Sequence, residues 1–372
     1  MDPTPDPNPP PEPPTIPPEA TAAINNDDIQ SLKKAQASLE SLSTILSTPL
    51  PSSLSSSKNP AFFLLHDSAT AAEISSLLRR PDSGAGDDPL CRWLYNTFQS
   101  ADPNLQLVVL RFIPMVAGVY LSRMASRKPR AGFEAVLLAL YVHETAARNG
   151  QAITISIPDL SHPSIYHDSK PATKNSATEI NIAVVSASLE PHGSMRSTRR
   201  ARIVGVALEL YYSKISMIPV ESKTDFCHFC TVWAGQDGDM YKDGLDPQMG
   251  KADEPEKLKN EGEAVEEESK ESSKEEREEA NKEGRIPLPW ELLQPVLRIL
   301  GHCLMGPDND DQRLHDAACT ACRSLYARAV HDVSPKAILA IGSLLRLAKM
   351  AAKAKEDDFD PTDLPNDSVI TG

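Results

Sequence analysis

The chain has 372 residues, of which 32 are prolines, and 40% of its residues are hydrophobic while only 5% are aromatic. A core built mainly from Leu, Ile, Val and Ala favours helices, and the length predicts one domain of moderate size, or two close-packed halves, with tails. The formal net charge of −14 argues against nucleic-acid binding as the main function.

Three segments lack the composition of a packed core. Residues 1–25 carry ten prolines in the first twenty positions, which predicts an extended, disordered tail. Residues 251–284 contain 14 acidic and seven basic residues and no aromatic, which predicts a disordered acidic insertion. Residues 356–372 predict a disordered acidic tail. The folded part is therefore expected in two stretches, residues 26–250 and residues 285–355.

Helix signals begin before the middle of the chain. Asp88 and Asp102 each precede a proline, an arrangement typical of a helix start because the carboxylate caps the first turn. The stretch Leu105–Leu121 is apolar nearly all round, so it is expected to lie centrally, with Pro114 breaking or kinking the helix. Polar interruptions in this stretch argue against a membrane span.

The clearest helix is expected from Phe133 onward, with a stop at Asn149 and Gly150. Its apolar residues share one face: Phe133, Val136, Leu137, Leu140 and Tyr141. The same spacing recurs from Leu90, from Ile203 and from Trp290, and Ser334 before Pro335 predicts one more helix start.

A strand-like alternation occurs once, at Ile153, Ile155 and Ile157, and predicts either a small hairpin or an extended connector. The predicted fold class is therefore all-α: a helical bundle or an irregular α-α array with at most a short β-hairpin, flanked by disordered tails.

Catalytic motifs are not recognisable in the sequence. There is no phosphate loop, no complete GxGxxG and no GxSxG, and the HExxH-like start at His143 has Ala147 where the second histidine would stand. We predict that the protein is not an enzyme, with no catalytic, cofactor-binding or metal-binding residues.

Cysteines offer one alternative, a zinc-binding helical module. Cys227 with Cys230 and Cys319 with Cys322 could supply four thiolates. However, 88 residues separate the pairs, and cysteines in an Ala-rich helical pattern usually pack as small apolar groups. No signal-peptide pattern precedes the six cysteines, so reduced thiols and an intracellular protein are expected.

Basic clusters offer a second alternative, an adaptor that binds anionic lipid directly. One cluster comprises Arg196, Arg199, Arg200 and Arg202, and the other comprises Arg123, Arg127, Lys128 and Arg130. Both also fit ordinary solvated loop charge.

Several stretches of the central sequence, in this order, resemble the hyccin family. They are Leu105–Tyr120 (LQLVVLRFIPMVAGVY), Glu134–Tyr141 (EAVLLALY) and Ser156–His167 (SIPDLSHPSIYH). The Cys227–Cys230 region is similar to a Cys-containing helix of the family, and Ile286 to about Met350 looks like its closing helices. The resemblance covers roughly Ile29–Met350, apart from the acidic insertion.

The resemblance implies a largely α-helical, noncatalytic scaffold or stabilising subunit of the plasma-membrane complex built around type III phosphatidylinositol 4-kinase alpha. The implied partners are a tetratricopeptide-repeat scaffold protein, the kinase and a membrane-anchor subunit. The implied location is the cytoplasm and the inner face of the plasma membrane, reached peripherally and mostly through partners. Such a role supports phosphatidylinositol 4-phosphate synthesis.

A partner interface is predicted on the proline-rich connector after the alternating stretch, because rigid prolines there accompany apolar side chains. Its residues are Pro158, Leu160, Pro163, Ile165 and Tyr166. The alternative is that the connector packs against its own helices.

Overall fold

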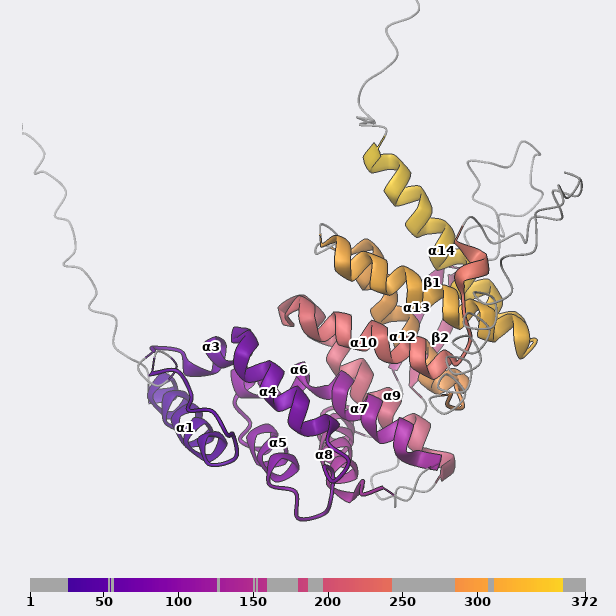
Figure 1. Cartoon of the computed structure of the whole chain (residues 1–372). Helices are drawn as coiled ribbons and strands as arrows, with labels where there is room; N and C mark the ends of the chain where they lie inside the picture. Colours follow the sequence, from indigo (N-terminus) through magenta and orange to yellow (C-terminus); the bar gives the residue numbers. More distant parts are fainter. Residues whose placement is uncertain are drawn as a thin grey trace, which may run out of the picture.

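A computed structural model of the chain shows an array of helices with one antiparallel pair of strands (Figure 1). The residues that the structure describes are 26–52, 54, 57–125, 128–149, 151, 153–158, 180–186, 197–242, 285–306 and 311–356. The all-α prediction, with at most a short hairpin, is confirmed.

The first half of the chain supplies one end of the array. Its elements are α1 (Asn26–Ser43), α3 (Pro60–His66), α4 (Ser68–Arg79), α5 (Pro89–Gln99), α6 (Pro103–Arg111), α7 (Ile113–Ser122), the 3-10 turn η1 (Arg123–Ala125) and α8 (Ala131–Ala147). The second half supplies the other end. Its elements are α9 (Ser197–Ser213), η4 (Ile215–Met217), α10 (Val220–Ala234), η5 (Asp239–Tyr241), α12 (Trp290–Met305), α13 (Gln312–His331) and α14 (Pro335–Glu356).

Both predicted Asp-Pro starts are confirmed. The Asp88 carboxylate accepts hydrogen bonds from the backbone N–H groups of Leu90 and Cys91, and Asp102 caps α6 in the same way. The helix α14 begins at Pro335, as the Ser-Pro pair predicts. These caps satisfy amide groups that the first turn of a helix cannot pair internally.

The apolar stretch predicted to be central is broken in two at Phe112, between α6 and α7, which meet at an angle of 40°. Pro114 lies in the first turn of α7, where its missing N–H costs no helical hydrogen bond. Residues from Ile113 to Leu121 are all buried inside the protein. Across the described ranges, no single helix is long and apolar enough to cross a membrane. The bent pair of α6 and α7 together has the length and apolar composition of a membrane span, but its residues from Ile113 to Leu121 are core residues.

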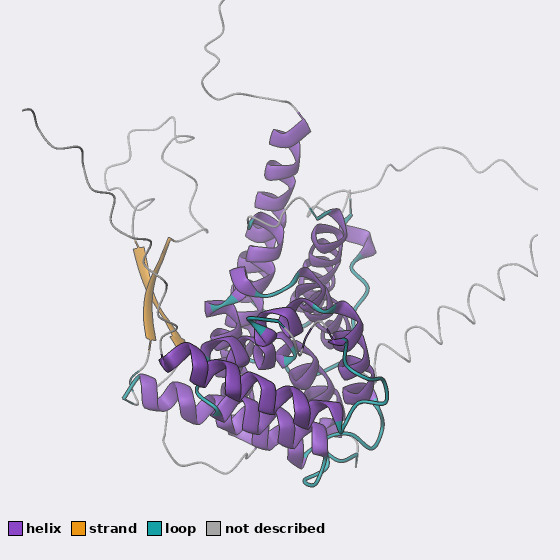
Figure 2. Ribbon diagram, turned by 90° about the vertical axis from the view of Figure 1, so that its left-hand side faces the viewer, coloured by secondary structure: helices purple, strands orange, loops and turns teal. Residues whose placement is uncertain are grey.

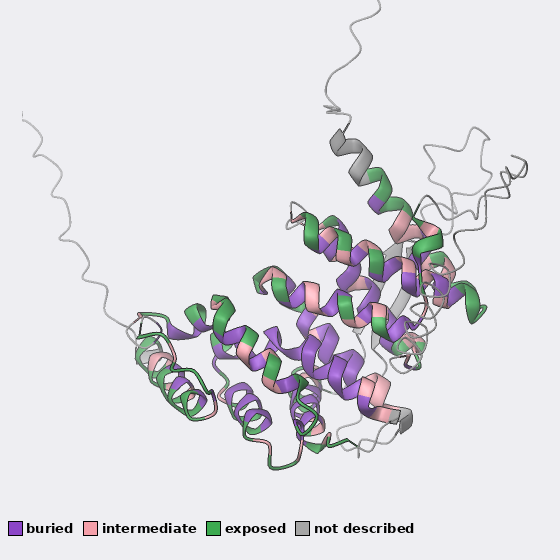
Figure 3. Ribbon diagram, in the orientation of Figure 1, coloured by how far each residue is buried: buried purple, intermediate pink, exposed green. Residues whose placement is uncertain are grey.

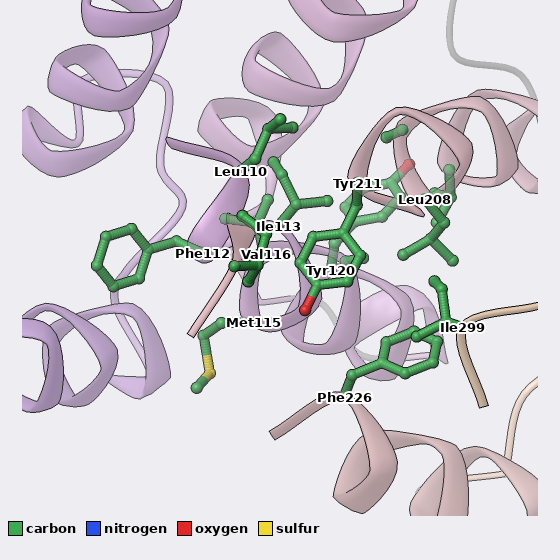
Figure 4. Packing of buried hydrophobic residues seen from close by; sticks show 14 of the residues in the cluster. Leu110, Phe112, Ile113, Met115, Val116, Tyr120, Leu208, Tyr211, Phe226 and Ile299 are labelled. Carbon is green, nitrogen blue, oxygen red and sulfur yellow. The ribbon is translucent and has the colours of Figure 1, made fainter. Parts of the chain in front are cut away.

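The core is one continuous cluster that joins helices distant in sequence. Figure 4 shows apolar side chains from α6, α7, α9, α10 and α12 converging around Ile113, Tyr120 and Phe226. The helix α10 packs on α13, and α9 packs on α12, although the predicted acidic insertion lies between the members of each pair. Figure 3 shows the buried residues concentrated where these helices face one another. The two expected stretches therefore form one packed unit.

The strand-like isoleucines form β1 (Ile153–Pro158), which pairs antiparallel with β2 (Ile180–Ser186). The hairpin lies beside the helices (Figure 2), and β2 contacts α9 and α12. Of the two alternatives for this stretch, the hairpin is thus confirmed. The partner strand β2 was not predicted from the sequence. Residues 1–25, 251–284 and 357–372 lie outside the described residues, so the predicted tails and acidic insertion stay predictions. Glu356, the first residue of the predicted acidic tail, is the last residue of α14.

Candidate functional site

The predicted interface connector is described only at its first residue. Pro158 is the last residue of β1 and pairs in register with Ile180 of β2. The remaining residues of the prediction, Leu160, Pro163, Ile165 and Tyr166, lie outside the described residues. Since β2 lies next to α9 and α12, the chain enters the connector from the edge of the helical array.

The two CxxC pairs do come together, because α10 packs on α13. Cys227, Cys230 and Cys322 are fully buried in the core, but the fourth buried thiol near them is Cys303 of α12. Cys319 is half-buried and contacts His315 instead, with the Sγ atom 3.8 Å from Nδ1.

Burial raises the pKa of the Cys230 thiol well above its usual range, as expected for a thiol enclosed by apolar side chains. In the described ranges, no group of three or more His, Cys, Asp or Glu side chains is placed to hold a metal ion. The buried cysteines act as small apolar core residues, and the zinc-module alternative gains no support.

The basic cluster that comprises Arg123, Arg127, Lys128 and Arg130 is not one exposed surface. Arg123 is buried, and its guanidinium donates to the backbone carbonyls of Arg80, Ser83 and Pro129. Arg130 pairs with Glu134 on the next turn, with 3.7 Å between Nε and Oε1. A cation that holds three carbonyl groups together inside the fold is structural, so the lipid-binding interpretation fails for Arg123.

The other basic cluster begins outside the described residues, at Arg196, and continues into α9. There the Arg200 Nε–H donates to the Tyr120 hydroxyl oxygen at 3.0 Å, and this hydroxyl donates to the Glu134 carboxylate at 3.1 Å. Desolvation raises the pKa of Tyr120 to about 12, which keeps the phenol protonated. Arg200 therefore fastens α9 to α7 and α8.

A buried ionic network was not foreseen from the sequence. The Arg148 guanidinium, just after α8, contacts Glu144 at 2.6 Å and Glu209 of α9 at 3.3 Å. Glu209 is 6% exposed, and desolvation outweighs its arginine neighbours and raises its pKa to about 7. The signal that could have found this network is Glu209 itself, a carboxylate within the apolar spacing of a helix.

This network predicts a pH-dependent stability. The carboxyl pKa of Glu209 rises from 4.5 to about 7 on folding, so the folded protein binds more protons between these values, and its free energy of unfolding falls as pH rises through them. In the wild-type protein we expect this contribution to lower the free energy of unfolding by on the order of 2 kcal/mol between about pH 5 and about pH 8. The variant Glu209→Gln should not show this decrease. Denaturant unfolding across this range measures it, with Glu40→Gln, an exposed site on α1, as the control. Parallel profiles for wild type and Glu209→Gln would contradict the assignment.

A cavity of about 360 Å³ lies between α4, α7 and α10. The buried Arg111 lines it and donates through Nη1 to the carbonyls of Leu65 and Asp67. At the same cavity Arg79 pairs with Asp225 at 3.1 Å, and Glu221 adds a second carboxylate. Two arginines and two carboxylates balance in charge, which suits the mixed side chains of a protein segment better than a phosphate group.

Large apolar side chains are exposed at both ends of the array. On α3, Phe62 and Phe63 are each about half exposed. On α14, Leu339 is 56% exposed and Met350 is 64% exposed. Exposed apolar side chains of this size, gathered on one element, are typical of contact surfaces for other macromolecules.

The sequence pattern that defines the Hyccin family matches residues 55–363. The match begins later than the resemblance first suggested, at residue 55 rather than near Ile29, and it continues past Met350. Helix α1 precedes the matched range, yet its Leu39 and Leu42 belong to the same core, and Trp93 of α5 donates to the carbonyl of Ser38. Since the matched range takes in all the helices from α3 to α14 and well over half of the sequence, this chain belongs to the Hyccin family.

Proposed function

We propose that this protein is a noncatalytic scaffold subunit that pairs with a tetratricopeptide-repeat protein and helps to assemble type III phosphatidylinositol 4-kinase alpha at the plasma membrane. The observation that carries the proposal is the family match over residues 55–363. Membership of this family supports a scaffold role in the kinase complex in general. The pairing, the membrane-anchor subunit and the location at the inner face of the plasma membrane are our more specific proposals.

The helical array is suited to such a role. It is a single packed unit, so it can present rigid surfaces at its two ends without ordering a chain on binding, which lowers the entropic cost of association. A partner that binds only the folded form of the repeat protein stabilises it by mass action, by about 2.7 kcal/mol at a hundredfold excess over Kd. Loss of this subunit should therefore expose its partner to degradation.

Removal of the protein from cells tests the proposal. We expect the amount of the repeat protein and of membrane-bound kinase to fall, while the turnover of purified kinase on phosphatidylinositol stays unchanged. Quantitative mass spectrometry of membrane fractions, together with an assay of the isolated kinase, measures both. Failure of the full chain to co-purify with any repeat protein or lipid kinase would overturn the proposed function.

For the interface itself we propose the connector that follows β1, formed by Pro158, Leu160, Pro163, Ile165 and Tyr166. A connector that leaves a two-stranded hairpin at the edge of the helices combines restrained prolines with apolar side chains, the combination that gives binding hot spots at low entropic cost.

The variant Tyr166→Ala tests this interface. We expect unchanged thermal unfolding and a loss of co-purified repeat protein of at least about tenfold, since truncation of a tyrosine at an interface hot spot costs about 2 kcal/mol or more. Tyr95→Ala, which removes a partly exposed tyrosine on α5, is the matched control and should keep the partner. Unfolding of Tyr166→Ala would show instead that the connector supports its own fold, and normal pairing would place the interface elsewhere.

A further inference from the structure

Helix α14 is basic, whereas the protein as a whole is acidic. The chain as a whole has a net charge of −14, but α14 carries Lys336, Arg346, Lys349, Lys353 and Lys355, with no acidic residue before Glu356 at its end. Such a local excess of positive charge on an acidic protein favours an anionic partner for this one element.

The same helix has two apolar faces. One face packs on α12 and α13 and includes the buried Ala337, Ile341 and Ala348. The other face carries Leu339, Leu347 and Met350, all exposed. Leu339 and Met350 are three helical turns apart and so stand on the same side, about 16 Å from each other along the axis. A packed helix needs only the first face, so the second is available for another contact.

The position of α14 makes this second face accessible. The helix lies at the edge of the array, and its C-terminal half projects beyond the neighbouring helices (Figures 1 and 2). Arg346 and Lys349 are exposed beside Leu347 and Met350. Lys336, at the start of the helix, lies 4.1 Å above the ring of Trp290, which leaves its charge at the surface.

We propose that the outward face of α14 binds an anionic lipid surface. Leucine and methionine side chains on a convex helix enter the boundary between headgroups and acyl chains, while flanking Lys and Arg side chains extend to the phosphates and carboxylates of the headgroups. An acidic protein partner is less favoured, because the exposed apolar residues stand on a convex, projecting helix (Figures 1 and 2) and do not line a concave site that would enclose a partner side chain. The contact adds a direct membrane attachment to whatever anchor the complex supplies.

Vesicle co-sedimentation of the purified full-length chain tests this proposal. We expect binding to phosphatidylserine-containing vesicles, weaker binding at raised salt, and little binding to vesicles of phosphatidylcholine alone. Arg346→Gln with Lys349→Gln should weaken binding about 30-fold, because each cation near an anionic surface contributes about a factor of five. The matched control is Lys33→Gln with Arg92→Gln, which removes the same charge from α1 and α5 at the other end of the array.

A second pair of variants tests the apolar part of the contact. Leu339→Gln with Met350→Gln should weaken vesicle binding about tenfold without changing thermal unfolding, since both side chains are exposed. Phe62→Gln with Phe63→Gln on α3 removes comparable exposed apolar groups and should leave vesicle binding unchanged.

Several results would overturn the proposal. They are no sedimentation of wild type with phosphatidylserine vesicles, equal binding by the α14 variants and their controls, and loss of a co-purifying protein from the α14 variants with vesicle binding intact. This last result would make the face a protein interface. The inference rests on the charge and exposure of α14 and not on the repeat-protein pairing. Failed pairing with intact vesicle binding would therefore contradict only the proposed function, and the reverse result would contradict only the lipid contact.

Discussion

Leu137→Asp is expected to cause the largest loss of folding stability in the isolated chain. Leu137 is fully buried on α8, which packs on α5, α7 and α9. The substitution leaves an unpaired carboxylate in an apolar site and also loses the packing of the leucine, at a combined cost of at least about 4 kcal/mol. Against a typical stability of roughly 5 to 15 kcal/mol, this loss should give insoluble protein or a greatly lowered melting temperature.

Val142→Asp provides the control on the same helix. Val142 is 52% exposed, so its replacement introduces the same charge into solvent and should change the free energy of unfolding by less than about 0.5 kcal/mol. Circular dichroism during thermal unfolding measures both variants. A stable Leu137→Asp protein, or an equal effect at the two positions, would show that α8 is not packed as described.

Arg123→Ala is expected to have the second largest effect. The Arg123 side chain is buried and joins the turn after α4 to the connection before α8 through the carbonyls of Arg80, Ser83 and Pro129. Its guanidinium also lies 5.4 Å from the centre of the Phe133 ring. Truncation removes these three hydrogen bonds and leaves the buried Ser83 carbonyl without its Arg123 donor, so we expect a loss of about 3 kcal/mol in the free energy of unfolding.

The reason for an arginine at this position can be tested with Arg123→Lys. A lysine keeps the charge but cannot present two nitrogen donors in a fixed plane, so we expect it to recover less than half of the stability lost in Arg123→Ala. Lys128→Ala, at an exposed cation in the connection that follows, should be nearly neutral. Chemical denaturation of the purified variants gives these differences, and full recovery by lysine would mean that charge alone is required.

Local signals in the sequence were sufficient for most of the helices. The Asp88 and Asp102 caps, the spacing after Phe133 and the break near Pro114 depend on atoms only a few residues apart, so the physics that sets them is visible in a short window. The family resemblance was likewise carried by short stretches, and the match over residues 55–363 bears it out. The predicted interface at Tyr166 is untested by the described residues and remains a prediction.

The environments of the buried charged and thiol side chains depend on long-range packing and could not be predicted from the sequence. From the sequence alone Arg123 fits an ordinary solvated loop cation, whereas the fold encloses it among three carbonyls. Glu209 stands within the apolar spacing of its helix, but only the packing of α8 on α9 brings its partner Arg148 to it. The two CxxC pairs meet only because α10 packs on α13, and the buried thiol that joins them is Cys303 from a third helix. Local composition and periodicity determine which segments become helices and which face of each is apolar. The environment of a charged or thiol side chain depends on desolvation by residues far away in the chain, and only the tertiary structure fixes those neighbours.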